Sequence, residues 1–170
     1  MRLVYLDNAL VSAVAKQEFW VDLTALSELF RLSAQGAFGL VTSEVTLREI
    51  ERCRNPQTKI EILSVYDGLA KVTLVEKERL LGFSSNWGEH GGWSNPIIEN
   101  DSQWLRLRQL GLSDTDAHHV MVAIRAGCSS FLTIDHRSIL QKRESVHQEF
   151  AIRLERPSEF LASHGSPQQS

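Results

Sequence analysis

The chain has 170 residues, of which 42% are hydrophobic and 23% are charged, and its formal net charge is -3 at pH 7. This length suits one domain with a single well-buried core, and the composition is typical of a soluble globular protein. A slightly acidic chain has no overall basic field, so any binding of nucleic acid has to be local or mediated by bound cations.

The beginning of the chain does not match a targeting or membrane-spanning segment. Asp7 and Asn8 interrupt the apolar run 3–6, so neither a signal peptide nor a spanning helix fits. The cysteines, Cys53 and Cys128, lack the spacing of a metal-binding finger, and we interpret them as reduced core residues. We therefore expect a cytoplasmic protein that does not enter a membrane.

Short apolar runs alternate with helical patterns along the chain. In the first half we expect strands at 3–7, 38–43 and 71–76, and helices at 8–18, 23–34, 44–54 (capped by Ser43) and 57–70 (after Pro56). In the second half we expect helices at 97–111, 116–127 (capped by Ser113 or Asp114) and 137–142, and strands at 130–135 and 150–155. This alternation predicts an α/β fold with a mainly parallel sheet covered by helices on both faces.

The domain boundaries follow from composition. We expect a single domain over residues 1–163 and a flexible tail over 164–170. A loop insertion at about 82–100, rich in glycine and tryptophan, interrupts the domain. Loops of this length are usually functional or mobile.

Acidic residues stand where predicted strands end. Asp7 closes the first strand and Asp135 closes the strand 130–135, and the carboxyl ends of parallel strands meet at the edge where ligands bind. The helix beginning near Asp114 adds Asp116, and the helix 44–54 can supply another carboxylate. Such acids repel one another unless a cation joins them, and Mg²⁺ or Mn²⁺ prefers carboxylate oxygens. Ions held in this way are suited to phosphodiester hydrolysis.

Stretches spread over nearly the whole chain resemble the PIN-domain ribonucleases, which include VapC-like toxins of toxin-antitoxin pairs. The stretches are "YLDNALVSAV", "VTSEVTLREIER", "SDTDAHHVMVAIRAGCSSFLTIDHRSIL" and "RLERPSEFLA". The third resembles the most recognisable block of the family and places Asp116, Ala117, His119, Ala123, Thr133 and Asp135 at matching positions.

The resemblance implies a PIN-like three-layer α/β/α sandwich with catalytic acids Asp7, Glu49, Asp116 and Asp135. It implies that Asp7, Asp116 and Asp135 bind Mg²⁺ or Mn²⁺. It also implies an RNA substrate, a small antitoxin partner and a homodimer. The chain departs from the family pattern directly after the first acid, where Asn8 is followed by the apolar Ala9. Asn8 can still orient Asp7.

Several of these acids also have simpler structural interpretations. Asp7 and Asp135 can be ordinary turn residues at strand ends, and Asp116 can complete a capping box opened by Ser113. We assign Asp114 mainly to helix capping, with an outer position around the metal as the alternative. Glu44 is the alternative to Glu49, because both lie on the same predicted helix.

The remaining candidates support the site or the fold. Thr133 and His119 are expected to hold the acids, and His118 and His119 fit packing or support better than zinc binding. Trp87, Trp93 and Trp104 can either stack on RNA bases or anchor the long loop, and we favour anchoring. Two basic stretches can contact phosphates or simply form solvated helix faces: Arg48, Arg52, Arg54 and Lys59, and Arg137, Lys142 and Arg143.

The sequence therefore predicts a metal-dependent endoribonuclease, with a non-catalytic PIN-like module that binds RNA or protein as the alternative. Ala9 is the best support for that alternative. A phospho-accepting receiver domain is disfavoured, because such a domain needs a lysine after a late strand and none follows 150–155.

Overall fold

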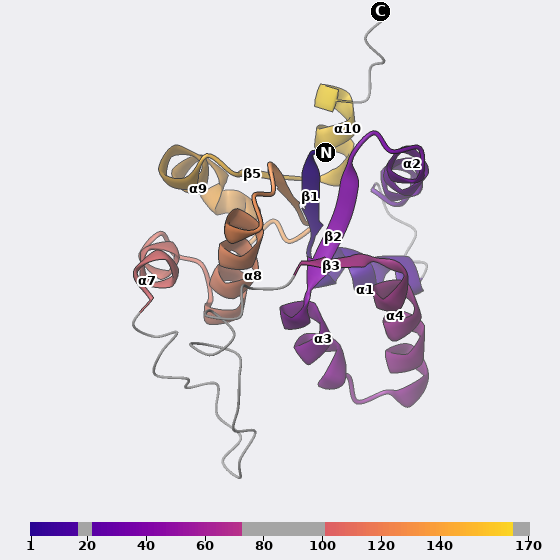
Figure 1. The fold of residues 1–170 in the computed structure, drawn as a ribbon. Coiled ribbons are helices and arrows are strands. Elements are labelled where there is room, and N and C mark those ends of the chain that lie inside the picture. Colours follow the sequence, from indigo (N-terminus) through magenta and orange to yellow (C-terminus); the bar gives the residue numbers. More distant parts are fainter. Residues whose placement is uncertain (17–21, 73–100, 165–170) are drawn as a thin grey trace, which may run out of the picture.

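A computed structural model describes residues 1–16, 22–72 and 101–164. The first part of the chain forms β1 (Leu3–Leu6), α1 (Asn8–Lys16), α2 (Leu23–Ala34), β2 (Gly39–Ser43), α3 (Glu44–Glu51), α4 (Pro56–Gly68) and β3 (Ala70–Val72) (Figure 1). The second part forms α7 (Ser102–Gln109), α8 (Asp114–Arg125), β4 (Ser130–Leu132), the short helix η1 (Leu140–Lys142), α9 (Arg143–Phe150), β5 (Arg153–Glu155) and α10 (Pro157–His164).

The described strands form one sheet of five parallel strands in the order β3-β2-β1-β4-β5. The predicted parallel α/β sheet is therefore confirmed. From β1 the chain adds β2 and β3 on one side and later adds β4 and β5 on the other. The order thus switches between β1 and β4, and the loops after these two strands lie where such sheets bind ligands.

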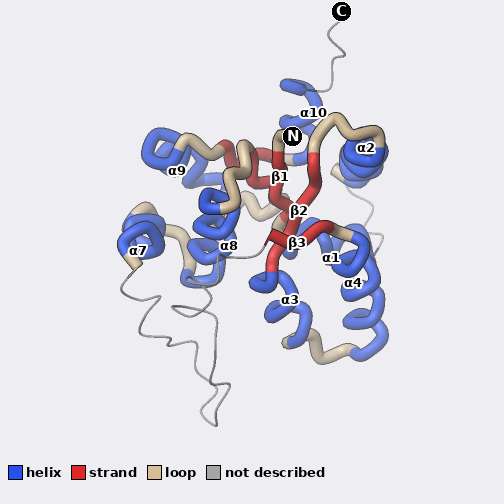
Figure 2. The backbone as a smooth tube through the Cα atoms, viewed as in Figure 1, coloured by secondary structure: helices blue, strands red, loops and turns tan. Residues whose placement is uncertain are grey.

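Alternating side chains of the strands build a core on each face of the sheet. Tyr5 and Phe131 face α7, α8 and α9, whereas Val4, Leu6 and Leu132 face α1, α2, α4 and α10. Figure 2 shows these two helical layers on either side of the strands. The result is the predicted three-layer α/β/α arrangement, held mainly by the removal of these apolar side chains from water.

Predicted helix starts agree with the structure where a polar side chain caps the first turn. Ser43 caps α3 by accepting the N–H of Val45, and Asn55 caps α4, in which Pro56 occupies the first turn. The helix predicted at 97–111 is described from Ser102, where Asp101 accepts the N–H groups of the first turn. Residues 73–100 lie outside the described part of the chain, and so do the end of the predicted third strand and the insertion.

Two helices near the end of the chain were not predicted. The helix α9 contributes one fully buried residue, Val146, so its sequence shows no apolar stripe. Phe150, predicted to begin the strand 150–155, is the last residue of α9. Ala151 then adopts a left-handed backbone conformation with a φ of 58°, and the strand β5 begins at Arg153. The helix α10 extends to His164, one residue past the predicted domain boundary.

None of the helices in the described residues combines the length and the apolar character needed to cross a membrane.

Candidate functional site

Asp7 lies at the switch point of the sheet, directly after β1. Its backbone N–H donates to the carbonyl of Leu132 at 3.1 Å, and its own carbonyl accepts the N–H groups of Leu10 and Val11 at the start of α1. The side chain is buried, and the hydroxyl of Thr133 donates to its Oδ2 at 2.7 Å. Asp7 is therefore fixed at both its backbone and its carboxylate.

The charge on Asp7 is unfavourable in this position. Burial raises the pKa of Asp7 to about 6, and the neighbouring carboxylates of Glu49 and Asp116 add to the rise. His119 and the bond from Thr133 act in the opposite direction. Burial combined with neighbouring like charges makes Asp7 a candidate functional-site residue, in addition to its place at the strand end.

The backbone of Asp135 is linked to Asp7 through Thr133. The hydroxyl that donates to Asp7 also accepts the backbone N–H of Asp135, at 3.0 Å. One carboxylate oxygen of Asp135 accepts the N–H of Ser138 at 2.9 Å and so shapes the turn before η1. The Asp135 carboxylate is thus a turn contact, and among the interactions of the described residues none joins it to the carboxylates of Asp7, Glu49 or Asp116.

Glu49 joins this edge from α3. Its Oε2 lies 2.7 Å from Nε2 of His119 on α8, and 25% of the Glu49 side chain is exposed. Glu49 perturbs the pKa of both Asp7 and His119, whereas Glu44 acts on Arg48 and Tyr66. Of the two candidate glutamates, Glu49 is therefore the one that the fold brings to Asp7.

Asp116 is held at the first turn of α8. The hydroxyl of Ser113 donates to Oδ2 of Asp116 at 2.6 Å and accepts the backbone N–H of Asp116 at 3.1 Å. Ser113 and Asp116 thus form a reciprocal cap related to the predicted capping box. The cap orients the carboxylate of Asp116 and leaves its other oxygen for a further partner.

The assignment of Asp114 to the cap is wrong. Ser113 has the extended backbone that a cap needs, with φ -67° and ψ 167°, and Asp114 is already the first helical residue. The Asp114 side chain is 63% exposed, and its carboxylate lies 2.5 Å from the guanidinium of Arg108. Asp114 is therefore an exposed side chain that is paired with Arg108.

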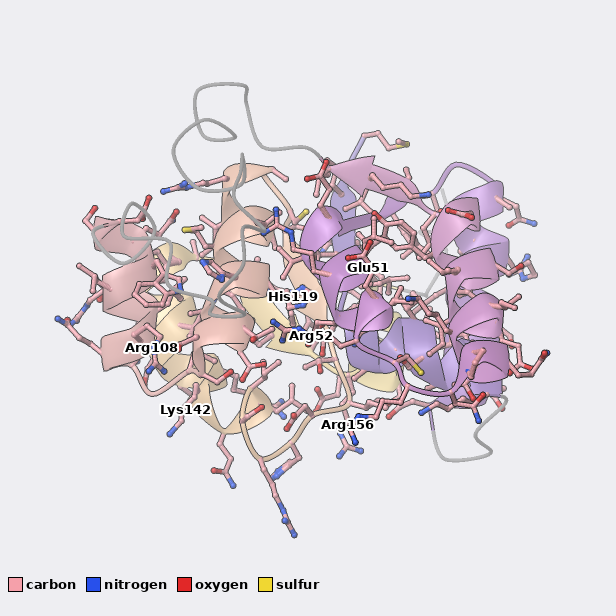
Figure 3. All side chains as sticks on the ribbon, turned by 90° about the horizontal axis from the view of Figure 1, so that it is seen from below. Glu51, Arg52, Arg108, His119, Lys142 and Arg156 are labelled. Atoms are coloured by element: carbon pink, nitrogen blue, oxygen red, sulfur yellow. The ribbon has the colours of Figure 1, made fainter. Side chains whose placement is uncertain are left out.

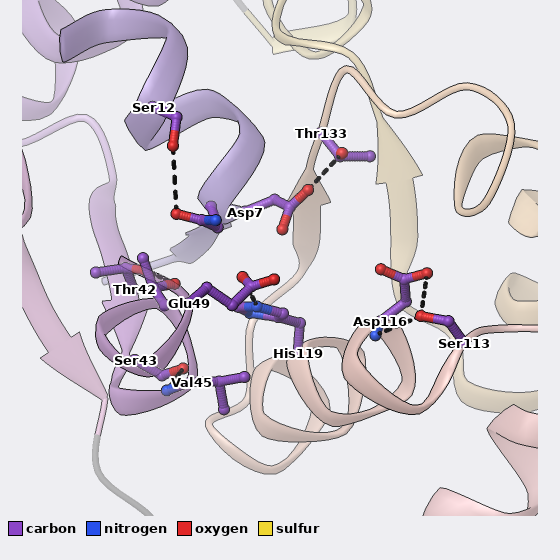
Figure 4. A network of polar contacts seen from close by, with 12 residues as sticks. Asp7, Ser12, Thr42, Ser43, Val45, Glu49, Ser113, Asp116, His119 and Thr133 are labelled. Atoms are coloured by element: carbon purple, nitrogen blue, oxygen red, sulfur yellow. Dashed lines mark hydrogen bonds and ion pairs between the residues drawn. The ribbon is translucent and has the colours of Figure 1, made fainter. Parts of the chain in front are cut away.

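Together, Asp7, Glu49 and Asp116 direct their carboxylates toward one space from β1, α3 and α8 (Figure 4). His119 is the basic side chain that contacts this group, through Glu49. Burial lowers the pKa of His119, but the bond to Glu49 and the charges of Asp7 and Asp116 outweigh burial, so the net change is upward. The chemistry of these donors suits a hard divalent cation. Among the described residues, however, no group of three or more His, Cys, Asp or Glu side chains is arranged so that it could hold a metal ion.

No family model, curated protein or solved structure matches this chain. The case for any function therefore depends on the site itself.

Sequence reasoning missed Tyr5 and Ser43 as parts of this site. The sequence pattern predicts Tyr5 only as part of an apolar strand and Ser43 only as a helix cap. The structure places the Tyr5 hydroxyl 2.9 Å from Nδ1 of His119 and 2.6 Å from Oγ of Ser43. The available signal was the polar hydroxyl of a tyrosine within a strand buried on both faces, because such a hydroxyl needs a partner.

Other predicted support residues have different partners. The side-chain oxygen of Asn8 accepts a 3.4 Å hydrogen bond from Ser12, one turn along α1, so Thr133 is the side chain that orients Asp7. His118 is buried with its ring 5.7 Å from that of Trp104, which agrees with a packing role. Trp104 is itself a buried core residue of α7, which excludes it as an exposed platform for RNA bases; Trp87 and Trp93 lie outside the described residues.

Cationic side chains surround the edge that carries the acids. Figure 3 looks onto this edge, with His119 near the middle. Of the predicted basic stretches, Arg143 is paired with Glu159 at 3.0 Å. Figure 3 labels the cations Arg52, Arg108, Lys142 and Arg156 together with the acidic Glu51. Arg108 is paired with Asp114, and Arg156 lies 3.8 Å from Asp22.

Proposed function

We propose that this chain is a metal-dependent endoribonuclease of PIN-like fold, in which Asp7, Glu49 and Asp116 hold Mg²⁺ or Mn²⁺ and Asp135 shapes the adjoining turn. The observation that carries the proposal is the buried carboxylate of Asp7, whose pKa is raised to about 6 in the company of Glu49 and Asp116. When bound, the ion supplies positive charge that activates water and stabilises the leaving oxygen of a phosphodiester.

The protein contributes the placement of the acids. Thr133 fixes one oxygen of Asp7, and Ser113 fixes one oxygen of Asp116. Each bond leaves the second oxygen for a cation. Arg52 and Lys142, which Figure 3 labels on this edge, are suited to contacts with the phosphates of an RNA chain, which position the substrate without reading its sequence.

The resemblance to VapC-like proteins also suggests a cellular role for the proposed nuclease. It favours a cytoplasmic toxin that forms a homodimer and is neutralised by a small antitoxin protein.

A non-catalytic PIN-like module that binds RNA or protein is the second candidate. Two observations favour it: Asn8 bonds to Ser12, and the next residue is the apolar Ala9. Calorimetric titration with Mn²⁺ at near-neutral pH separates the candidates. The nuclease should bind the ion, and absence of binding would favour the non-catalytic module.

The central test is Asp116→Asn, with Asp114→Asn as its matched control. Both changes replace one carboxylate in the first turn of α8, but Asp114 is exposed and paired with Arg108. Cleavage of RNA with Mg²⁺ should fall on the order of 100-fold in Asp116→Asn and stay near wild type in Asp114→Asn. Undiminished cleavage by Asp116→Asn would remove Asp116 from the site.

A further inference from the structure

A series of buried hydrogen bonds links α3, β1 and α8 and ends at Glu49. The N–H of Val45 donates to Ser43 at 3.3 Å, and the Ser43 hydroxyl lies 2.6 Å from that of Tyr5. The Tyr5 hydroxyl lies 2.9 Å from Nδ1 of His119, whose Nε2 lies 2.7 Å from Glu49. The side chains of Ser43, Tyr5 and His119 are at most 2% exposed, so only the Glu49 end reaches solvent.

The bonds have a direction because the Glu49 end is a fixed acceptor. An ionised carboxylate can only accept, so Nε2 of His119 carries the hydrogen that lies between the imidazole and Glu49. In a neutral ring Nδ1 is then an acceptor, and the hydroxyl of Tyr5 donates to it. If the ring is protonated, Nδ1 donates to Tyr5 instead, but Nε2 still donates to Glu49. The contact to Glu49 is therefore kept in both states.

Ring packing restricts the same residues further. The ring of Tyr5 stacks on that of Phe131 at 5.2 Å with an interplanar angle of 9°. The ring of His119 meets Tyr5 edge-on at 5.9 Å and 69°. Because Tyr5 contacts both the ring and Nδ1 of His119, the orientation of the imidazole is restricted and its Nε2 points toward Glu49.

We propose that His119 is a positioning residue for the carboxylate of Glu49, and that Tyr5 fixes the imidazole ring for this purpose. Glu49 belongs to the helix α3, whereas Asp7 directly follows β1, and the side chain of Glu49 has several rotatable bonds. The contact with His119 selects the orientation in which Glu49 shares its space with Asp7 and Asp116 (Figure 4). This inference rests on the proposed function, in which Glu49 is one of the acids that hold the cation.

The test removes only the buried hydroxyl, by Tyr5→Phe, with Tyr66→Phe as the matched control. Tyr66 is a buried tyrosine of α4 in the core on the opposite face of the sheet. We expect Tyr5→Phe to lower kcat roughly 10-fold with little change in KM, and Tyr66→Phe to leave kcat unchanged. His119→Leu should lose more activity than His119→Gln, because a glutamine amide can still donate to Glu49.

Crystal structures give a readout that does not depend on activity. In wild type the Glu49 carboxylate should occupy one position against His119, and in Tyr5→Phe it should leave that position or occupy several. A Glu49 side chain that stays unmoved in Tyr5→Phe, or a Tyr5→Phe protein with wild-type kcat, would overturn the inference. Wild-type protein that neither binds Mn²⁺ nor cuts RNA would instead refute the proposed function, and the position of Glu49 would still decide the role of His119.

Discussion

The hydroxyl of Thr133 donates a 2.7 Å hydrogen bond to Oδ2 of Asp7, across the switch point between β4 and β1. Replacing Thr133 by valine keeps the shape of the side chain but leaves a buried carboxylate without this donor. We expect Thr133→Val to lower the free energy of unfolding at pH 7 by about 1–3 kcal/mol, measured in urea. Thr133→Ser, which keeps the hydroxyl, should recover most of the loss. Equal stability of the valine variant and wild type would show that the bond does not hold Asp7.

Asp7 should make the protein less stable as the pH rises. Its pKa is raised from 3.8 to about 6 in the folded protein, so the folded state holds this proton more tightly than the unfolded chain. The stabilisation is present below about pH 4 and is lost as the pH rises through about 6. The asparagine in Asp7→Asn cannot ionise. The free energy of unfolding of this variant, relative to that of wild type, should therefore rise between about pH 4 and pH 6, by at most about 3 kcal/mol. Urea unfolding at several pH values measures the difference.

The same variant tests the cation. At pH 7, Mn²⁺ should raise the melting temperature of wild type, because a ligand that binds only the folded state stabilises it. Asp7→Asn should respond much less. An equal response of both proteins would place the ion elsewhere.

His118 should have the opposite pH dependence. Burial lowers its pKa to about 4, with smaller contributions from His119 and Arg48, against which Asp114 and Asp101 act. The unfolded chain therefore holds this proton more tightly than the folded state, and stability is lost as the pH falls from about 6.5 to 4. His118→Phe keeps a ring against Trp104 and cannot be protonated, so it should flatten the acid side of the stability curve. A variant that loses stability with acid as steeply as wild type would contradict this.

The two glutamates of α3 provide a matched pair for the site itself. Glu49→Gln removes the charge that faces Asp7 and His119, whereas Glu44→Gln removes a charge that acts on Arg48 and Tyr66. We expect Glu49→Gln to weaken Mn²⁺ binding roughly 10- to 100-fold in calorimetry and Glu44→Gln to leave it near wild type. The reverse result would transfer the role to Glu44.

The part of the fold that could be predicted is the part encoded by local patterns. The apolar runs around Tyr5 and Phe131 predicted buried strands, and their alternation with helices predicted a parallel sheet. Asp7 was found because it directly follows β1, and parallel strands end at a common edge. Asp135 was predicted to close the strand 130–135, but β4 ends at Leu132 and the Asp135 carboxylate shapes a turn. The helix α9 was missed because it buries little besides Val146, so its sequence carries no such pattern.

By itself, the sequence determined the order of the strands and of the helices that carry an apolar stripe, and the edge of the sheet where Asp7 lies, because hydrophobic periodicity and strand ends are properties of neighbouring residues. Only the tertiary structure decided that Glu49 rather than Glu44 reaches Asp7, and that Tyr5 supports His119. Tyr5 and His119 are 114 positions apart in the chain. A hydrogen bond over that separation depends on how α8 packs against the sheet, and no local pattern of residues encodes that packing.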